Sequence, residues 1–237
     1  MVRKFYTSWN VSLKERKPLT QSLSTEGYYK PLYQPKVLAI IQARTSSTRF
    51  PNKIYAQLNG APLLYHTINR VGLVSYISTA VVASTETLDL PDGTPLYEYR
   101  GPVEDVLSRY YHCALQYKPD YIVRLTSDCP VLDPLLMDYI VLQAIINKAD
   151  YCSNVLELSF PDGQDCEVMS MKLLKHLQEV VRHPKDREHV TLAFRNSIKM
   201  QSDFNTVSIC NDKDLSDIKM SVDYPEDLSN LEQMELV

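Results

Sequence analysis

The strongest constraint on the fold is a repeated alternation between short apolar runs and amphipathic stretches. Residues 37–41 form an almost continuous apolar run, and similar runs lie at 80–83 and 121–125. Such runs are typical of strands buried on both faces of a parallel sheet. The intervening residues 62–71 and 103–117 carry apolar side chains at helical spacing. The alternation predicts βαβ units, and therefore a three-layer α/β domain with a mainly parallel sheet.

The rest of the chain extends this pattern with less regular signals. We expect helices at 135–147, 170–182 and 184–198 and from Pro225 onward, and strands at 151–155, 165–169, 205–210 and 218–222. Residues 89–95 are rich in proline, aspartate and glycine, which predicts turns in place of a helix or strand in the short stretch 84–101. Residues 1–35 are polar and aperiodic. We expect them to be an N-terminal extension, disordered or packed across a domain of residues 36–237.

Composition narrows the class of protein. The 237 residues are 44% hydrophobic and 23% charged, as in soluble globular proteins, and the formal net charge is −4. General nucleic-acid binders usually have a basic excess, so we expect no nucleic-acid partner, although a local basic pocket is compatible with this charge. No stretch approaches the ~20 apolar residues of a membrane helix, and no apolar run follows Arg3 and Lys4 as in a secretory signal. The five cysteines form no C-x-x-C pair, which favours unpaired thiols in a reducing, cytoplasmic setting.

A cluster of cations follows the first predicted strand. Arg44, Arg49 and Lys53 lie in one loop, and the small hydroxyl residues 45–48 separate the two arginines. Arginine and lysine offset phosphate charge, and small residues let backbone N–H groups approach phosphate oxygens. The loop therefore suits a triphosphate, and a solvated basic loop is the alternative. Neither a G-x-x-x-x-G-K-[ST] nor a G-x-G-x-x-G motif is present, so a P-loop or a dinucleotide-binding fold is not expected.

Two aspartates occupy loops at the carboxyl ends of predicted strands, where parallel sheets bind their ligands. Asp128 follows the strand expected at 121–125, and Asp223 precedes the last helix, in which Pro225 suits the first position. Two carboxylates from separate loops could hold Mg²⁺ against triphosphate oxygens. The alternative is that Asp128 orders a turn and Asp223 favours the N-terminus of the helix.

Five stretches carry, in order, a resemblance to known enzymes. Residues 41–53 resemble the A-R-x-x-S-x-R-x-P-x-K signature of the cytidylyltransferases that activate acidic sugars. These include acylneuraminate and ketodeoxyoctulosonate (KDO) cytidylyltransferases and members of the spore-coat polysaccharide type. Residues 101–110, 124–130, 186–191 and 222–228 resemble the family segments G-x-x-E-D-V-L-x-R-Y, R-x-T-x-D-C-P, R-E-H-V-T and V-D-x-P-E-D-L. The sequence departs from the family in the short stretch 84–101 and at Asn52, where glycine is common, although asparagine tolerates a left-handed turn.

The resemblance implies a nucleotide-diphospho-sugar transferase (GT-A-like) fold and specific site residues. It implies catalytic roles for Arg44, Arg49, Lys53 and Asp128, and Mg²⁺ binding by Asp128 and Asp223. The residues that it implies in nucleotide binding are Gln42, Ala43, Arg44, Ser46, Arg49, Lys53, Ser84, Thr126 and Ser127. Residues 162–168 resemble the family's D-G-x-D-x-E-V stretch, and with the R-E-H segment they imply acceptor contacts by Asp165, Glu167, Arg187 and His189.

The implied activity is transfer of CMP from CTP to an acidic sugar, with release of pyrophosphate, for surface glycan synthesis. Members of the family commonly pair, so the resemblance also implies a homodimer. Two alternatives stay open at this point. The acceptor could be a phosphorylated or phosphonate compound, or the chain could be a nucleotide-binding module without turnover.

Overall fold

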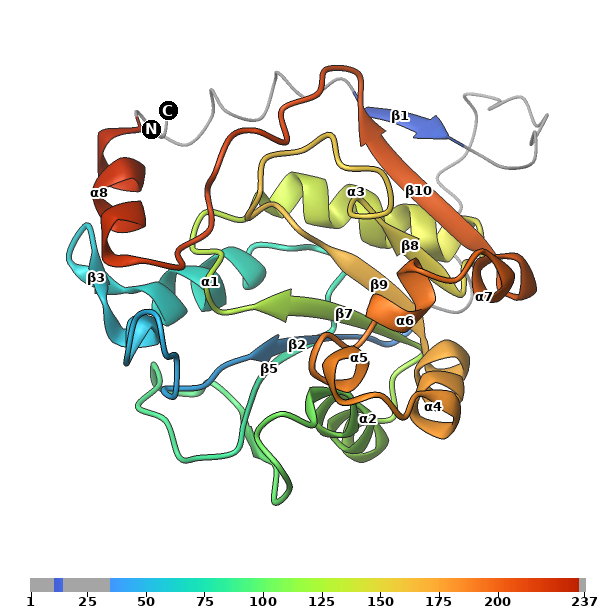
Figure 1. The fold of residues 1–237 in the computed structure, drawn as a ribbon, viewed down its shortest axis with the longest axis horizontal. Coiled ribbons are helices and arrows are strands. Elements are labelled where there is room, and N and C mark those ends of the chain that lie inside the picture. The colour runs from blue at the N-terminus through green and yellow to red at the C-terminus, as the bar shows by residue number, and fades with distance from the viewer. Residues whose placement is uncertain (1–10, 15–34, 235–237) are drawn as a thin grey trace.

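A computed structural model describes residues 11–14 and 35–234 of the chain. In this part of the chain an eight-stranded sheet has the order β1-β10-β8-β9-β7-β2-β5-β6 (Figure 1). Its strands are β1 (Val11–Lys14), β2 (Val37–Gln42), β5 (Thr79–Ser84), β6 (Leu96–Glu98), β7 (Tyr121–Thr126), β8 (Tyr151–Ser153), β9 (Glu167–Ser170) and β10 (Thr206–Asn211). A small separate sheet pairs β3 (Gln57–Leu58) with β4 (Ala61–Pro62).

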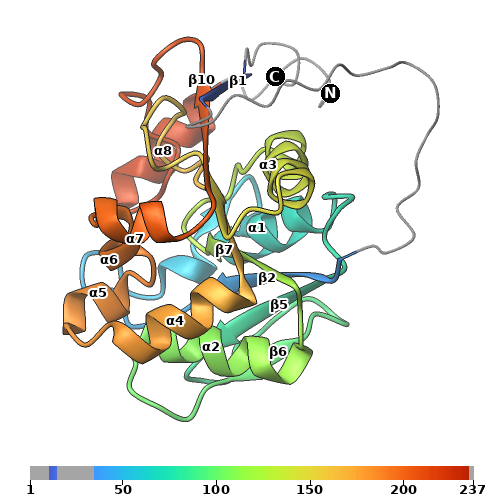
Figure 2. The same cartoon turned by 90° about the vertical axis from the view of Figure 1, so that its right-hand side faces the viewer.

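Helices enclose the sheet on both faces (Figure 2). They are α1 (Leu63–Val71), α2 (Val106–Tyr117), α3 (Pro134–Ile146), α4 (Met171–Val180), α5 (Pro184–Glu188), α6 (Leu192–Arg195), α7 (Ile198–Asp203) and α8 (Pro225–Gln233), with a 3₁₀ helix η2 (Lys53–Tyr55) after β2. Ala39 and Ile41 of β2 pack in a core with α1 and α3, whereas Leu38 and Ile40 pack with α2 and α4. Because successive strand residues point to opposite faces, one apolar run fills both cores. The predicted three-layer fold is confirmed.

The strand order brings several chain segments to one edge of the sheet. β2 lies between β5 and β7 and runs parallel to both, so the carboxyl ends of these strands meet. β9 runs antiparallel between β7 and β8, and its first residue, Glu167, pairs with Arg124 of β7. The segment that leads into β9 therefore reaches the same edge as the loop after β7. The sheet is mainly parallel, as predicted, with β9 and the edge strand β1 reversed.

The structure corrects three local predictions. The helix predicted at 103–117 begins at Val106, because the Asp105 side chain accepts a hydrogen bond from Ser108 N (3.2 Å) and caps it there. No strand is predicted in the short stretch 84–101, where turns are expected at 89–95, yet β6 follows these turns and pairs with β5. The strand predicted at 218–222 is reduced to an isolated bridge between Lys219 and Asp162.

The single helix predicted at 184–198 is broken in two. Between α5 and α6, Val190 adopts a left-handed backbone with φ of 57°. This conformation is rare for a β-branched residue and costs roughly 1–3 kcal/mol, so the surroundings must hold it in place. Val190 is completely buried in the core formed with α2 and α4, which supplies that constraint.

The N-terminal stretch contributes one strand, although no regular element is predicted there. β1 pairs antiparallel with β10 and forms the edge of the sheet. The predicted character of residues 1–10 and 15–34 lies outside the described residues. All five cysteines are buried and unpaired. Among the described helices, none has the length and apolar composition needed to cross a membrane.

Candidate active site

A polar cleft of about 390 Å³ lies at the sheet edge where β2, β7 and the start of β9 meet. Loops after β2 and β7, the segment before β9, the α5–α6 region and the segment before α8 form its walls. The predicted site residues that line the cleft are Gln42, Ala43, Arg44, Arg49, Lys53, Thr126, Ser127, Asp128, Asp165, His189 and Asp223. The cleft therefore lies where an open parallel sheet is expected to bind its ligand.

The basic loop, residues 43–53, is a closed turn that fixes the position of Lys53. Asn52 has φ of 58° and ψ of 22°, so asparagine does adopt the left-handed turn at this position. The loop closes through a hydrogen bond from Asn52 N to the carbonyl of Thr45 (3.0 Å). Thr45 N in turn donates to Glu86 Oε1 (2.8 Å) in the loop after β5. Hydrogen bonds therefore connect the start of the basic loop both to its end and to the loop after β5.

Lys53 joins two carboxylates that lie far apart in the sequence. Its Nζ donates to Asp128 Oδ2 (2.9 Å) and to the carbonyl of Val222 (2.9 Å), and it lies 3.5 Å from Asp223 Oδ1. Val222 N donates to the carbonyl of Asp128 (2.9 Å), which ties the two loops together directly. The structure thus brings the two predicted metal ligands together around one lysine, whose side chain is 12% exposed.

The charge state of Asp128 follows from this lysine. Partial burial works to raise the pKa of Asp128, but the charge of Lys53 and hydrogen bonds from Thr126 and Lys53 hold that pKa below its usual value. The carboxylate is therefore ionised at neutral pH. With Asp223 and the Val222 carbonyl, it presents the hard oxygen donors that Mg²⁺ prefers, to be completed by phosphate oxygens and water. No group of three His, Cys, Asp or Glu side chains that could hold a metal occurs in residues 35–234, so a metal here would complete its coordination with water or with oxygens of the nucleotide.

Arg49 also lines the cleft and lies next to Asp223, one of the two carboxylates near Lys53. Its Nη2 contacts Asp223 Oδ1 at 2.7 Å, and its guanidinium lies 5.3 Å from the centre of the Tyr224 ring. The Arg49 side chain is 53% exposed. An exposed ion pair contributes little to stability, so Arg49 can exchange Asp223 for a phosphate group at small cost.

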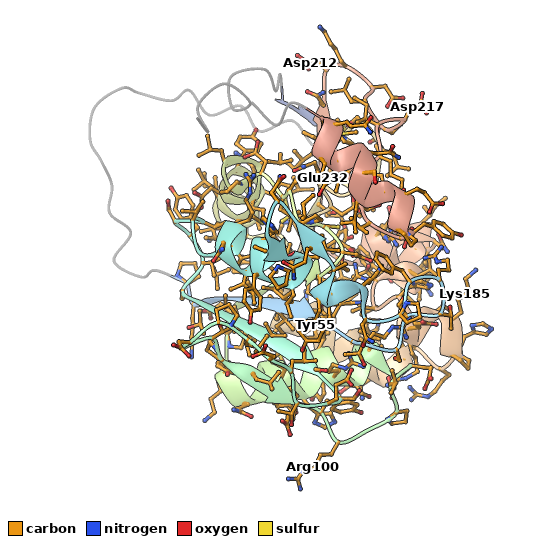
Figure 3. The ribbon with its side chains drawn as sticks, turned by 90° about the vertical axis from the view of Figure 1, so that its left-hand side faces the viewer. Tyr55, Arg100, Lys185, Asp212, Asp217 and Glu232 are labelled. Atoms are coloured by element: carbon orange, nitrogen blue, oxygen red, sulfur yellow. The ribbon has the colours of Figure 1, made fainter. Side chains whose placement is uncertain are left out.

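The opposite wall comes from the α5–α6 region. Arg44 Nη2 lies 3.3 Å from Glu188 Oε1, which connects the basic loop to the end of α5. His189 follows Glu188 and lines the cleft. Lys185 of the same helix lies instead on the outer surface of the molecule (Figure 3). α5 therefore presents its C-terminal end, and not its length, to the cleft.

Three predicted site residues lie away from the cleft. Arg187 binds both carboxylate oxygens of Asp105, at 2.9 and 3.2 Å, and so fastens α5 to the start of α2. Ser84 is completely buried at the end of β5. Ser46 is exposed on the basic loop but does not belong to the cleft lining. These three positions do not belong to the lining of the cleft.

Glu167, predicted to contact the acceptor, lies behind the cleft wall. It is 2% exposed, binds Arg124 Nη1 through Oε1 at 2.5 Å, and accepts hydrogen bonds from the hydroxyls of Tyr151 and Thr191. Burial works to raise the pKa of Glu167, but the charges of Arg124 and Arg195 and these hydrogen bonds hold it below its usual value. Glu167 therefore fixes the orientation of Arg124, which does line the cleft.

The segment before β9 reaches the cleft through a close backbone contact. Gly163 has φ of 102°, and a Cβ atom there would lie 2.6 Å from the carbonyl carbon of Met220 and the nitrogen of Ser221. Glycine is thus required for the 162–165 segment to pack against the segment that carries Asp223. Asp165 lines the cleft, where partial burial and the charges of Glu167 and Asp162 raise its pKa to about 6.

The cleft also contains charged residues that the sequence analysis does not single out: Arg109, Arg124, Asp162, Glu188 and Arg195. Some of these residues carry a signal in the sequence: Arg124 interrupts an apolar run, and Arg109 and Glu188 lie inside family segments. Arg195 had none. Five buried side-chain polar atoms in the described residues lack a hydrogen-bond partner, and four belong to the cleft: Gln42 Oε1 and the Nε atoms of Arg109, Arg124 and Arg195. Such atoms are rare in proteins, so the surroundings of the cleft hold an unusual concentration of unsatisfied buried polar groups.

Comparisons with known proteins agree with one another on the family of this chain. The chain is 32% identical to the spore coat polysaccharide biosynthesis protein SpsF of Bacillus subtilis over 171 residues, which cover 68% of this chain and 70% of SpsF. The chain spans 65 and 70% of the lengths of the first two curated relatives that it matches. A solved cytidylyltransferase from Leptospira borgpetersenii superposes with a TM-score of 0.76 at 28% identity, covering 84% of this chain and 85% of that one.

A more distant structure supports the fold alone. It is CMP:2-keto-3-deoxy-manno-octonic acid synthetase in complex with CTP, with a TM-score of 0.60 at 15% identity, covering 83% of this chain and 97% of that one. The decisive match is a family model described as cytidylyltransferase, which covers residues 38–236. The chain belongs to the cytidylyltransferase family.

Proposed function

We propose that the protein transfers CMP from CTP to an anionic sugar and releases pyrophosphate, for surface glycan synthesis. One observation carries this proposal: the cations of the basic loop meet Asp128 and Asp223 in a single cleft, and the lining of that cleft also includes Arg109, Arg124 and Arg195. Relatives with CTP, KDO and coat polysaccharide in their names support the same reading.

The charges of the cleft suit a triphosphate bound together with Mg²⁺. Without a ligand, each cation of the basic loop is already paired: Lys53 with Asp128 and Asp223, Arg49 with Asp223, and Arg44 with Glu188. A triphosphate alone would therefore meet cations that are neutralised by carboxylates. Mg²⁺ held by Asp128 and Asp223 would engage those carboxylates and supply positive charge to the phosphates, which leaves Lys53 and Arg49 free to bind phosphate oxygens.

The protein's part in the reaction is positioning and charge stabilisation. An acceptor oxygen attacks the α-phosphorus, a new P–O bond forms, and the bond to the β-phosphate oxygen breaks as pyrophosphate leaves. Lys53 and Arg49 offset the negative charge that develops on the phosphates, and the cleft holds the acceptor oxygen close to the phosphorus. No covalent intermediate with the enzyme is needed.

The test is pyrophosphate release with CTP, Mg²⁺ and a panel of acidic sugars, phosphorylated sugars and phosphonates. We expect release with an acidic sugar, and its loss in Arg49→Ala. CTP binding with no release across the panel would favour a nucleotide-binding module without turnover. Release with a phosphorylated or phosphonate acceptor alone would move the proposal to that acceptor class.

The assembly and setting of the enzyme are part of the same proposal. The expected homodimer should give twice the chain mass by light scattering at working concentration, and a monomeric mass would end this idea. Five buried, unpaired thiols suit the reducing cytoplasm, where CTP-dependent synthesis of a sugar nucleotide would take place.

A further inference from the structure

The ring of Tyr224 lies beside two cations, one of which belongs to the basic loop. The centre of the ring is 5.3 Å from the Arg49 guanidinium and 5.6 Å from the Lys219 ammonium group. Both distances fall within the ~6 Å over which the face of an aromatic ring attracts a cation. Arg49 lines the cleft, whereas Lys219 does not belong to its lining. The tyrosine therefore connects a predicted phosphate-binding residue with a cation outside the cleft.

Neither core packing nor helix capping accounts for a tyrosine at this position. Tyr224 is 41% exposed and lies outside the packed cores. It occupies the N-cap position of α8, where serine, threonine, aspartate and asparagine are preferred. Asp227 supplies the cap instead, because its Oδ2 accepts hydrogen bonds from the backbone nitrogens of Tyr224 (2.9 Å) and Asp223 (2.7 Å). The side chain of Tyr224 is thus left for contacts outside the helix.

The ring is held in place from the side that faces away from Arg49 in the chain. Lys219 Nζ lies 2.8 Å from Asp227 Oδ2, in the first turn of α8, and 3.8 Å from Asp223 Oδ2. The Asp227 side chain is only 9% exposed, and solvent screens a partly buried pair less than an exposed one. Pro225 favours the extended backbone that Tyr224 adopts, with φ of −127° and ψ of 159°. These restraints place the ring before a ligand binds.

Arg49 has a freedom of movement that the ring restricts. Its side chain is 53% exposed, and within residues 35–234 it forms an ion pair with one carboxylate, that of Asp223. Asp223 is also a predicted metal ligand, and an oxygen engaged by Mg²⁺ is no longer available to Arg49. A long side chain released in this way gains rotamer freedom, which the binding of phosphate must then remove again. A neutral ring does not compete with phosphate for the metal, and it attracts the guanidinium whether or not Asp223 is engaged.

We propose that the Tyr224 ring is a positioning residue for Arg49, which keeps the guanidinium beside the cleft after Asp223 has turned to the metal. Arg49 is then already ordered when the triphosphate binds. Tyr224 contacts neither nucleotide nor acceptor in this arrangement and acts through Arg49. The identification of the ligand of Arg49 as a triphosphate rests on the proposed function. The effect of the ring on the guanidinium rests on the contacts of Tyr224 with Arg49 and Lys219.

Side-chain NMR tests the effect of the ring without any turnover. A guanidinium beside an aromatic ring carries a ring-current shift, which is followed on Arg49 in ¹⁵N-arginine-labelled protein and assigned with Arg49→Lys. We expect the shift to persist when Mg²⁺ is added, to remain in Tyr224→Phe and to disappear in Tyr224→Leu. Tyr76 is similarly exposed (43%) and does not line the cleft, so Tyr76→Leu should leave the shift unchanged. Loss of the shift on addition of Mg²⁺, or its persistence in Tyr224→Leu, would overturn the proposal.

A double-mutant cycle provides the second test, with CTP affinity measured by calorimetry in the presence of Mg²⁺ and kcat/KM for CTP measured with an accepted acceptor. Tyr224→Leu should lower both quantities by roughly three- to tenfold, in line with a cation–π contact at a partly desolvated site. Tyr224→Phe should stay within twofold of wild type. In the Arg49→Ala background, Tyr224→Leu should cause no further loss of CTP affinity, because it acts through Arg49.

The outcomes of the cycle separate this proposal from the proposed function. An equal loss from Tyr224→Leu in the wild-type and Arg49→Ala backgrounds would show a role independent of Arg49 and overturn the proposal. If wild type neither binds CTP nor releases pyrophosphate, while the ring-current shift of Arg49 behaves as expected, the proposed function fails and the positioning of Arg49 by Tyr224 stands.

Discussion

Replacing Lys53 by methionine tests the central charge arrangement of the cleft. The substitution keeps a long side chain but removes the ammonium group that contacts Asp128 at 2.9 Å, the Val222 carbonyl at 2.9 Å and Asp223 at 3.5 Å. Two carboxylates would then face each other without a cation between them. We therefore expect a loss of stability in the metal-free protein and a stronger response to Mg²⁺.

The size of the stability loss follows from the contacts. A hydrogen bond to a charged group contributes about 1.5–3 kcal/mol, and Lys53 makes two of them with a third, longer contact. The aspartates are 30 and 27% exposed, so solvent screening reduces the sum. A net loss of about 1.5–3 kcal/mol corresponds to a fall in Tm of roughly 3–12 °C for a domain of this size.

The assay is thermal unfolding of wild type and Lys53→Met over a Mg²⁺ titration. Mg²⁺ should stabilise the variant more than wild type, because the ammonium group no longer competes for the carboxylates. The double variant Lys53→Met/Asp128→Asn should regain stability without Mg²⁺ and lose the enhanced response. Activity of Lys53→Met should fall by roughly 10²–10³ even with saturating Mg²⁺. An unchanged Tm together with an unchanged Mg²⁺ response would refute the reasoning.

Four further predictions follow from the same cleft. Arg49→Ala should lower kcat by roughly 10²–10³ in a folded protein, and activity within a few-fold of wild type would remove Arg49 from the site. Asp128→Asn, Asp223→Asn and the double variant should lose activity to a similar, large extent with a raised Mg²⁺ requirement, whereas multiplicative losses would indicate that the aspartates act separately. Asp165 has a pKa of about 6, above its ordinary 3.8, so it costs folding stability above pH 6, and that cost disappears as the pH falls toward 3.8. Asp165→Asn should accordingly raise Tm at pH 7.5 but not below pH of about 4, and a Tm gain independent of pH would show another cause. CTP with Mg²⁺ should raise Tm more than UTP, ATP or GTP, and equal shifts would argue against a preference for cytosine.

The sheet could be predicted because its central strands are buried on both faces. Burial from both sides leaves short, nearly continuous apolar runs, which mark β2, β5 and β7 in the sequence. The break at Val190 and the loss of a strand at 218–222 depend on tertiary contacts that leave no local pattern. Val190 is held by the core under it, and the 218–222 segment is held by the close approach of Gly163.

The sequence predicts those parts of the candidate site whose place depends on which loop carries them. The rule that ligands bind beyond parallel strands places Lys53, Asp128 and Asp223 at one edge, and the structure brings them into contact. How deeply a side chain is buried could not be predicted in the same way, because alternation along a strand does not distinguish a cleft wall from the interior behind it. Glu167 is therefore buried rather than exposed to the ligand. Arg195 lies at the end of a four-residue helix with no motif around it.

The reversed direction of β9 brings two differently built parts of the chain to one edge of the sheet. The basic loop and Asp128 are carried by the parallel strands β2 and β7, whose spacing is fixed by two packed cores. The segment before β9 arrives at the same edge from the opposite direction, in a connection that contributes no strand to those cores. Gly163 and the buried Phe160 and Cys166 fix this connection in place, so only its cleft-lining positions such as Asp165 can vary while the basic loop and its aspartates keep their places. We expect substitutions at such positions to change the choice of acceptor while the binding of the nucleotide is kept.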